Sequence, residues 1–367
     1  VAPPPRRRSP GFARANSAVS AKQPLSHFSR PQGISPGAPA TRRVAPPPRR
    51  RSPGFAVANS AVSAKVVFIL RFAIYGAMMQ DTALPFRKMN GLGNEIVVLD
   101  ARRSHVALMA EEAARIATDP RTRFDQLMVL YDADPVETDA LVEIFNTDGS
   151  AAEACGNGMR CVALTVYEQT GRTQQSYETA AGMLDVTMTG PDRIAVDMGR
   201  PGLSSDDIPT RDPFHDTTCI ELQIGPIDDP ILHSPSVCSM GNPHAVFWVD
   251  DLDGYDLSRI GPLLEHHPIF LEGANITLAK VESRTRTRIR TWERGAGLTK
   301  ACGSAACATL VNAARTDRMD RSGEIIVPGG PLHIEWAAND HVIMTGPAEL
   351  EHVGTVTFHA SGGMTIA

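Results

Sequence analysis

Residues 145–156, FNTDGSAAEACG, and residues 292–303, WERGAGLTKACG, share one pattern at an offset of 147 residues. Each stretch begins with an aromatic and a polar residue, continues through a segment that contains glycine, and ends in a Cys-Gly pair. The cysteine, Cys155 or Cys302, lies nine residues after the polar residue. One such match could arise by chance, so its meaning depends on whether other segments repeat at the same spacing.

Other segments do repeat at nearly this spacing. Three further pairs match at an offset of 148: Asn94 with Asn242, GMLDV at 182–186 with GPLHI at 330–334, and DRIAV at 192–196 with DHVIM at 340–344. We therefore predict two homologous halves, at residues 84–205 and 232–360, joined by a linker at 206–231. The last strand could pack on the first half.

The same kinds of element are expected in both halves. Short apolar runs at 97–99 and 246–249 predict buried strands, and alternation at 141–145 and 286–292 predicts half-buried strands. Helices are expected at 107–117 and, after each Cys-Gly pair, at 159–168 and 305–314, with hairpins at 183–198 and 332–344. Each half is thus a mixed unit of α-helix and β-sheet, with a sheet wrapped on a helix.

Charge divides the chain into two unlike pieces. The first 78 residues contain no Asp or Glu but hold 13 of the 36 basic residues, which leaves 23 basic residues against 41 acidic ones in the rest. An acidic body argues against nucleic-acid binding by the folded part. The apolar run at 66–79 is short and interrupted by Arg71, so we expect no membrane span.

The basic tail also repeats itself, because residues 1–22 return at 44–65 with one change. Its Pro, Arg, Ser and Ala content buries too little apolar surface to offset chain entropy, so we predict that 1–79 is disordered. Three interpretations stay open: a start placed too early, with Met78 or Met79 as the working start; an organelle transit segment; and, least favoured, a secretory signal.

Six cysteines are present, and none has the C-x-x-C spacing of a zinc or redox motif. We expect reduced thiols, as in a cytoplasmic enzyme, and no metal site. A buried cysteine is most often an inert core residue. That interpretation is applied to Cys161, Cys219, Cys238 and Cys307.

The two repeated cysteines call for another interpretation. A cysteine at a helix N-terminus feels the positive end of the helix dipole, so we expect a lowered pKa for Cys155 and Cys302. Duplicated halves usually face each other about a pseudo-two-fold axis, which would place both thiols on one cleft. A thiolate and a thiol on opposite faces of one carbon can remove a proton and supply another, which inverts that carbon. No motif for pyridoxal phosphate is evident, so we expect no cofactor.

Six segments of the body resemble the diaminopimelate epimerase family along residues 84–360. They are FRKMNGLGN at 86–94, FNTDGS at 145–150, ACGNGMRC at 154–161, GNPH at 241–244, AN at 274–275 and ERGAGLTKACGS at 293–304. The resemblance implies the interconversion of LL- and meso-diaminopimelate, a late step towards lysine and peptidoglycan. It also implies an α+β fold of two pseudo-symmetric domains, each a β-barrel-like sheet around a central helix, often in a homodimer.

The resemblance also implies roles for individual residues. Cys155 and Cys302 become the two acid/base residues, and His244 and Glu293 the groups that tune or orient them. The substrate would be held by Asn94, Gln126, Asn146, Gly156, Asn157, Asn242, Asn275, Arg294, Gly303 and Ser304. Two departures from the family pattern, Glu95-Ile96 for Asp-Phe and Ala305 for Gly, change the pocket shape slightly.

Two rival functions stay open. A proline or hydroxyproline racemase would share the fold and the pair of thiols, but it should lack Gln126, Asn275 and Arg294 for a second amino-acid end. A non-catalytic binding or redox-sensing module would use the cysteine pair without exchanging an α-proton with solvent.

Overall fold

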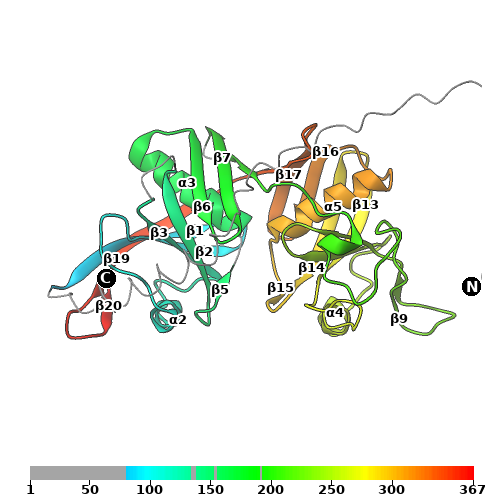
Figure 1. Ribbon diagram of the computed structural model, residues 1–367, viewed down its shortest axis with the longest axis horizontal. Coiled ribbons are helices and arrows are strands. Elements are labelled where there is room, and N and C mark those ends of the chain that lie inside the picture. The colour runs from blue at the N-terminus through cyan, green and yellow to red at the C-terminus, as the bar shows by residue number, and fades with distance from the viewer. Residues whose placement is uncertain (1–79, 134–137, 153–154, 191) are drawn as a thin grey trace, which may run out of the picture. The chain divides into compact units, whose positions relative to one another are not determined.

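Two successive sets of elements with the same order form the described part of the chain (Figure 1). The computed structural model describes residues 80–133, 138–152, 155–190 and 192–367. The predicted disordered tail, 1–79, lies outside the described residues. None of the helices in these ranges has the length and apolar character that crossing a bilayer requires.

The first set comprises β1 (Thr82–Asn90), β2 (Glu95–Asp100), α2 (Ala110–Thr118), β3 (Gln126–Tyr131), β4 (Ala140–Asn146), β5 (Ala151–Ala152), α3 (Gly156–Thr170), β6 (Gln174–Thr179), β7 (Gly182–Gly190) and β8 (Arg193–Asp197). The second set comprises β11 (Ser236–Ser239), β12 (Pro243–Trp248), α4 (Leu257–Glu265), β13 (Asn275–Ser283), β14 (Arg286–Glu293), β15 (Gly297–Leu298), α5 (Gly303–Arg315), β16 (Ser322–Val327), β17 (Gly330–Trp336) and β18 (Val342–Gly346).

Strand pairing follows one scheme in both sets. In the first, β1–β2, β3–β4, β4–β5, β6–β7 and β7–β8 are antiparallel, whereas β2–β3 and β4–β6 are parallel. The second set repeats each of these pairings, from β11–β12 to β17–β18, with the same directions. The repeat in the sequence is therefore a repeat of topology.

A helix lies at the centre of each set. The strands β1, β2, β3, β7 and β8 contact α3, and β11, β12, β13, β16, β17 and β18 contact α5 (Figure 1). Every residue of α3 from Gly156 to Val166 is buried, as expected for a helix with apolar neighbours all round. The predicted α+β fold, with a sheet wrapped around a central helix in each half, is confirmed.

The remaining helices cover the other face of each sheet. Ile116 of α2 packs with Phe86 and Leu99, and Leu264 of α4 packs with Phe247. The helix predicted at 107–117 begins three residues late, at Ala110. The reason is local: Leu108 donates its N–H to the Tyr131 hydroxyl at 3.0 Å, and this bond holds the preceding backbone outside the helix.

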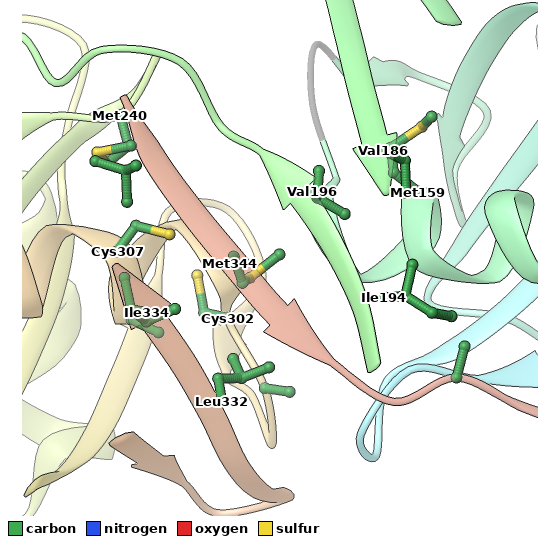
Figure 2. Packing of buried hydrophobic residues seen from close by; sticks show 14 of the residues in the cluster. Met159, Val186, Ile194, Val196, Met240, Cys302, Cys307, Leu332, Ile334 and Met344 are labelled. Atoms are coloured by element: carbon green, nitrogen blue, oxygen red, sulfur yellow. The ribbon is translucent and has the colours of Figure 1, made fainter. Parts of the chain in front are cut away.

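One strand pair joins the two sets. Strands β8 and β18 are antiparallel, with Val196 opposite Met344. These two residues are equivalent in the repeat, at an offset of 148. A pseudo-two-fold axis therefore passes between them. Figure 2 shows Met344 on β18 with Val196 on β8 and Cys302 nearby.

Segments outside the two sets pack against them. Within the predicted linker, which includes η2 (Ser205–Asp207) and β9 (Gln223–Ile224, paired with β10, Leu232–His233), the side chains of Ile208, Ile220 and Leu222 are buried. After the second set, β19 (Glu349–Phe358) pairs with β1, and β20 (Met364–Ile366) pairs with β19. The proposed domain limits, 84–205 and 232–360, remain a prediction.

Among the described glycines, Gly329 is the one at which an added Cβ atom would come closest to the other set. A Cβ atom there would lie 1.8 Å from the carbonyl oxygen of Leu92 and 2.8 Å from its carbon, both backbone atoms. We predict that Gly329→Ala lowers the free energy of unfolding by about 1–3 kcal/mol, measured by denaturant titration. Gly190→Ala is the control, because no described atom lies within 4 Å of its Cβ position and its φ is not positive. Equal stability of the two variants would contradict this contact.

Candidate active site

Both repeated cysteines are helix N-caps, as predicted. Cys155 has extended backbone at φ −147° and precedes α3, and its Sγ accepts a hydrogen bond from the N–H of Gly158 at 3.1 Å. Cys302 precedes α5 in the same way, at φ −120°, and its Sγ lies 3.5 Å from the Ser304 hydroxyl. Each thiol therefore lies beside the unpaired N–H groups of a helix start.

The first turns of the two helices lie against each other. Asn157, only 3% exposed, donates from Nδ2 to the carbonyl oxygen of Ala301 at 3.1 Å, directly before Cys302. A Cβ atom at Gly303 would lie 3.3 Å from Oδ1 of Asn157. The sequence repeat and the fold thus bring the two Cys-Gly pairs to one place, which the offset alone could not establish.

Met344 separates the two helix starts. A Cβ atom at Gly156 would lie 2.4 Å from its Cε, and one at Gly303 would lie 2.8 Å from its Sδ. A Cβ atom at either position would therefore displace the end of the Met344 side chain. Sequence reasoning assigned no role to Met344. The sequence feature that could have pointed to Met344 is the repeat, in which it is equivalent to Val196.

The expected lowering of the thiol pKa values is wrong. Burial raises the pKa of Cys155 to about 11; the Gly158 N–H opposes this, and the Glu293 carboxylate adds to it. Burial also raises the pKa of Cys302 well above its usual value, and the Glu293 charge raises it further. The helix starts do supply donors, but removal from water outweighs them.

Glu293 lies beside the thiols at the end of β14. It accepts hydrogen bonds from the Thr299 hydroxyl and from the Cys302 thiol. The short hairpin of β14 and β15 carries Thr299 back to this position. Burial raises the pKa of the Glu293 carboxyl. Such a carboxylate is a stronger base than one in water, and it is in contact with a thiol proton.

His244 is a completely buried imidazole on β12. Its Nε2 lies 2.8 Å from Oδ1 of Asn242, and its Nδ1 has no hydrogen-bond partner among the described residues. Burial lowers the pKa of His244 to about 3, and the nearby charge of Arg294 contributes. The imidazole is therefore neutral at neutral pH, able to accept or donate one hydrogen bond at each nitrogen.

A hydrogen-bonded group surrounds this histidine. Asn275 lies opposite His244 in the parallel β12–β13 register, and its Nδ2 donates to the Pro243 carbonyl at 3.1 Å. Its Oδ1 accepts from the backbone N–H of Arg294 at 2.9 Å. The Arg294 guanidinium donates to the carbonyl of Glu272 at 3.1 Å and is partly exposed. The predicted residues Asn242, His244, Asn275 and Arg294 thus lie together.

The first half has an equivalent group. Gln126 lies opposite Ile96 in the β2–β3 register, as Asn275 lies opposite His244, and opposite Asn146 in the β3–β4 register. Asn94 donates to the Asp125 carboxylate at 2.9 Å, and Asn146 donates to the Ser150 hydroxyl at 3.0 Å. The predicted residues of this half therefore occupy the same ends of β2, β3 and β4.

The other four cysteines divide into two kinds. Cys161, Cys238 and Cys307 are completely buried, as predicted for core residues. Cys219 is exposed, so the interpretation as a core residue is wrong for it. It lies in the irregular segment before β9, where the next residue, Ile220, is buried instead.

Comparison with known proteins identifies the family. A model of the family "Diaminopimelate epimerase" matches residues 86–203 and 236–351. Proteins named diaminopimelate epimerase from Nitrobacter hamburgensis and Methylobacterium sp. are 58% and 60% identical to the chain over 272 and 274 residues. These matches cover 74% and 73% of this chain and 94% of each relative. The chain belongs to the diaminopimelate epimerase family.

Membership makes the chain an isomerase, and the two repeats of the family cover both cysteine sites.

Solved structures agree on the fold. A predicted epimerase from Pseudomonas aeruginosa aligns with a TM-score of 0.55 at 19% identity, covering 74% of this chain and 98% of that one. A hydroxyproline epimerase from Agrobacterium vitis aligns with a TM-score of 0.53 at 15% identity, covering 76% and 94%. At these identities the likeness concerns the fold alone.

The buried imidazole of this epimerase-family chain predicts a pH effect on stability. The pKa of His244 is about 3 when folded, against about 6.5 when unfolded, so unfolding takes up a proton between these values. Its contribution to stability is complete above about pH 6.5 and is lost as the pH falls towards 3. In His244→Asn, the free energy of unfolding should fall less steeply between pH 4 and 6, by about 1.4 kcal/mol per pH unit.

Denaturant titrations at several pH values measure this slope. His352→Asn, at an exposed histidine, is the control and should keep the steeper slope of the natural chain. An unchanged slope in His244→Asn would mean that the imidazole is charged in the folded protein.

Proposed function

We propose that the chain interconverts LL- and meso-2,6-diaminopimelate through two-thiol proton transfer at one α-carbon, without a cofactor. The observation that supports this most is the pair of N-capping cysteines on two touching, symmetry-related helix starts. A single such cysteine could be a nucleophile or an anion site. A pair related by a pseudo-two-fold axis fits the removal of a proton from one face and its delivery to the other.

The helix starts supply what the intermediate needs. Loss of the α-proton places negative charge on the α-carbon and its carboxylate. The N–H groups of Gly156, Asn157, Gly303 and Ser304 lie in the first turns of α3 and α5, where no intrahelical partner exists for them. Donors fixed in advance around a buried carboxylate stabilise that charge without reorganisation.

Protonation of the pair follows from the electrostatics. Burial raises the pKa of both thiols, so one proton must leave before either sulfur acts as a base. Glu293 acts electrostatically on both thiols and has a raised pKa, so it can take this proton. The ammonium group of the substrate then favours a thiolate nearby. The sulfur that is a thiolate takes the α-proton, and the other gives its proton to the opposite face.

The polar side chains around the thiols would hold the two amino-acid ends. We assign His244 and Glu293 to the tuning of the thiols. Substrate binding is assigned to Asn94, Gln126, Asn146, Asn157, Asn242, Asn275, Arg294 and Ser304, with the backbones of Gly156 and Gly303. Arg294 and the asparagines would bind the distal end, which excludes amino acids with one centre.

The cellular setting is part of the proposal. The reaction is a late step towards lysine and peptidoglycan, so we place the chain in the cytoplasm. We further propose a homodimer, which light scattering of the purified protein would test.

Deuterium exchange tests the function directly. In D₂O, the purified protein should convert LL-diaminopimelate to the meso isomer with deuterium at the inverted carbon, read by NMR and mass spectrometry. Cys155→Ala and Cys302→Ala should each lower the rate by about 10²–10⁴-fold, because each removes one acid/base group. Cys219→Ala, at an exposed thiol outside the site, should match the natural chain.

Other outcomes distinguish the rivals. Racemisation of proline or hydroxyproline in place of diaminopimelate would indicate the racemase. Absence of α-proton exchange with any of these amino acids would indicate a non-catalytic module.

A further inference from the structure

Arg160 on α3 is a buried cation with no acidic partner among the described residues. It is the largest side chain that is completely buried. A guanidinium stays charged in proteins. Here Nε donates to the Pro347 carbonyl at 2.9 Å, Nη1 lies 3.6 Å from Sδ of Met344, and Nη2 has no hydrogen-bond partner. Burial of an unpaired charge is strongly unfavourable, so another interaction must offset it.

The groups around this charge are thiols. Arg160 acts electrostatically on Cys155 and Cys161 of its own helix and on Cys307 of α5. It also contacts Met344, the side chain that lies between Gly156 and Gly303. Arg160 therefore lies directly behind the two helix starts.

The charge breaks the symmetry of the site. At the repeat offset of 147, the residue equivalent to Arg160 is Cys307, which carries no charge. Glu293 breaks the symmetry in the opposite sense, because its equivalent is the neutral Asn146. One half thus holds a buried cation behind its cysteine, and the other holds a carboxylate beside its cysteine.

We propose that Arg160 is a positioning residue that makes the two thiols unequal, its buried charge favouring the thiolate of Cys155 while Glu293 keeps Cys302 a thiol. The inference deepens the proposed function and rests on it. Arg160 contacts Met344 and lies on the helix that Cys155 caps, so it acts on the site through these two residues.

The charged groups around the two thiols favour ionisation of Cys155 before Cys302. Burial raises the pKa of Cys155 most, Glu293 from β14 raises it further, and Arg160 from α3 lowers it. Cys302 is subject to Glu293, which raises its pKa by both charge and hydrogen bond. Behind them, Glu351 of β19 acts on Cys161, and Cys238 acts on Cys307.

If Cys155 ionises first, the two thiols must be reset after each turnover. When Cys155 begins as the thiolate, its Sγ takes the α-proton and the Cys302 thiol delivers its own proton to the opposite face. Cys155 then holds the thiol and Cys302 the thiolate. Return to the starting state requires the net transfer of one proton from Cys155 to Cys302, by way of solvent or Glu293.

Alkylation of the full chain by iodoacetamide, followed by peptide mass spectrometry, tests the role of the charge. Arg160→Met removes the charge at similar length, so Cys155 should react about tenfold more slowly than in the natural chain at the same pH, with Cys302 nearly unchanged. Arg160→Lys keeps the charge and should restore most of the Cys155 rate. Cys307→Ala, at the equivalent buried position, should leave Cys155 unchanged.

Several results would overturn the inference: equal slowing of both cysteines in Arg160→Met, an Arg160→Lys variant that behaves like Arg160→Met, or a comparable effect of Cys307→Ala. If Arg160→Met does not fold, a measurement on the natural chain still tests the inference. NMR titration of the two ¹³Cβ signals should show Cys155 ionising at lower pH than Cys302, and the reverse order would overturn the inference.

These measurements are independent of the proposed reaction, because neither uses diaminopimelate. If Cys155 ionises at lower pH than Cys302 but the chain does not epimerise diaminopimelate, only the proposed function is contradicted. If the chain epimerises diaminopimelate but both cysteines ionise at the same pH, only the inference is contradicted.

Discussion

The close contact of two helix starts on either side of Met344 is the constraint on which the site depends. Gly156 and Gly303 meet this side chain so closely that no Cβ would fit without a shift, and Asn157 bonds across to Ala301. Met344 lies opposite its own repeat equivalent, Val196, in the only strand pair that joins the two sets within the described residues. The pairing of β8 with β18 thus fixes the pseudo-two-fold axis, and the axis brings the two N-capping cysteines together.

Desolvation sets the chemistry of these cysteines. A helix start alone would give an acidic thiol, but burial raises both pKa values. The thiols therefore stay neutral until a proton is removed. Glu293, Arg160 and the incoming ammonium group are the charges that can shift this balance. The same burial lowers the pKa of His244, so its imidazole is neutral at neutral pH.

Much of this architecture can be predicted from the sequence, because the repeat is a physical pattern. The alternation at 286–292 became β14, with buried and exposed residues alternating as expected. Each Cys-Gly pair marked a helix start because glycine and a polar cap suit that position. The family resemblance was confirmed by matches over both repeats.

Other features could not be predicted, for identifiable reasons. Helix α4 contains Pro262, which normally argues against a helix interior, and its start depends on the Asp256 cap. The pKa directions depend on burial, which no local pattern reports. Arg160 stands within a quoted motif, yet its complete burial follows from the packing of β18 against α3, segments 184 residues apart. Long-range packing of this kind decides which charges a site must accommodate.

A crystal structure with an unreactive diaminopimelate analogue bound would test the central claim most directly. The account predicts that the α-carbon lies between the two sulfur atoms of Cys155 and Cys302, at about 3–3.5 Å from each and on opposite faces, with its carboxylate at the starts of α3 and α5. An α-carbon in contact with only one of these sulfurs, or approached by both from the same face, would contradict it.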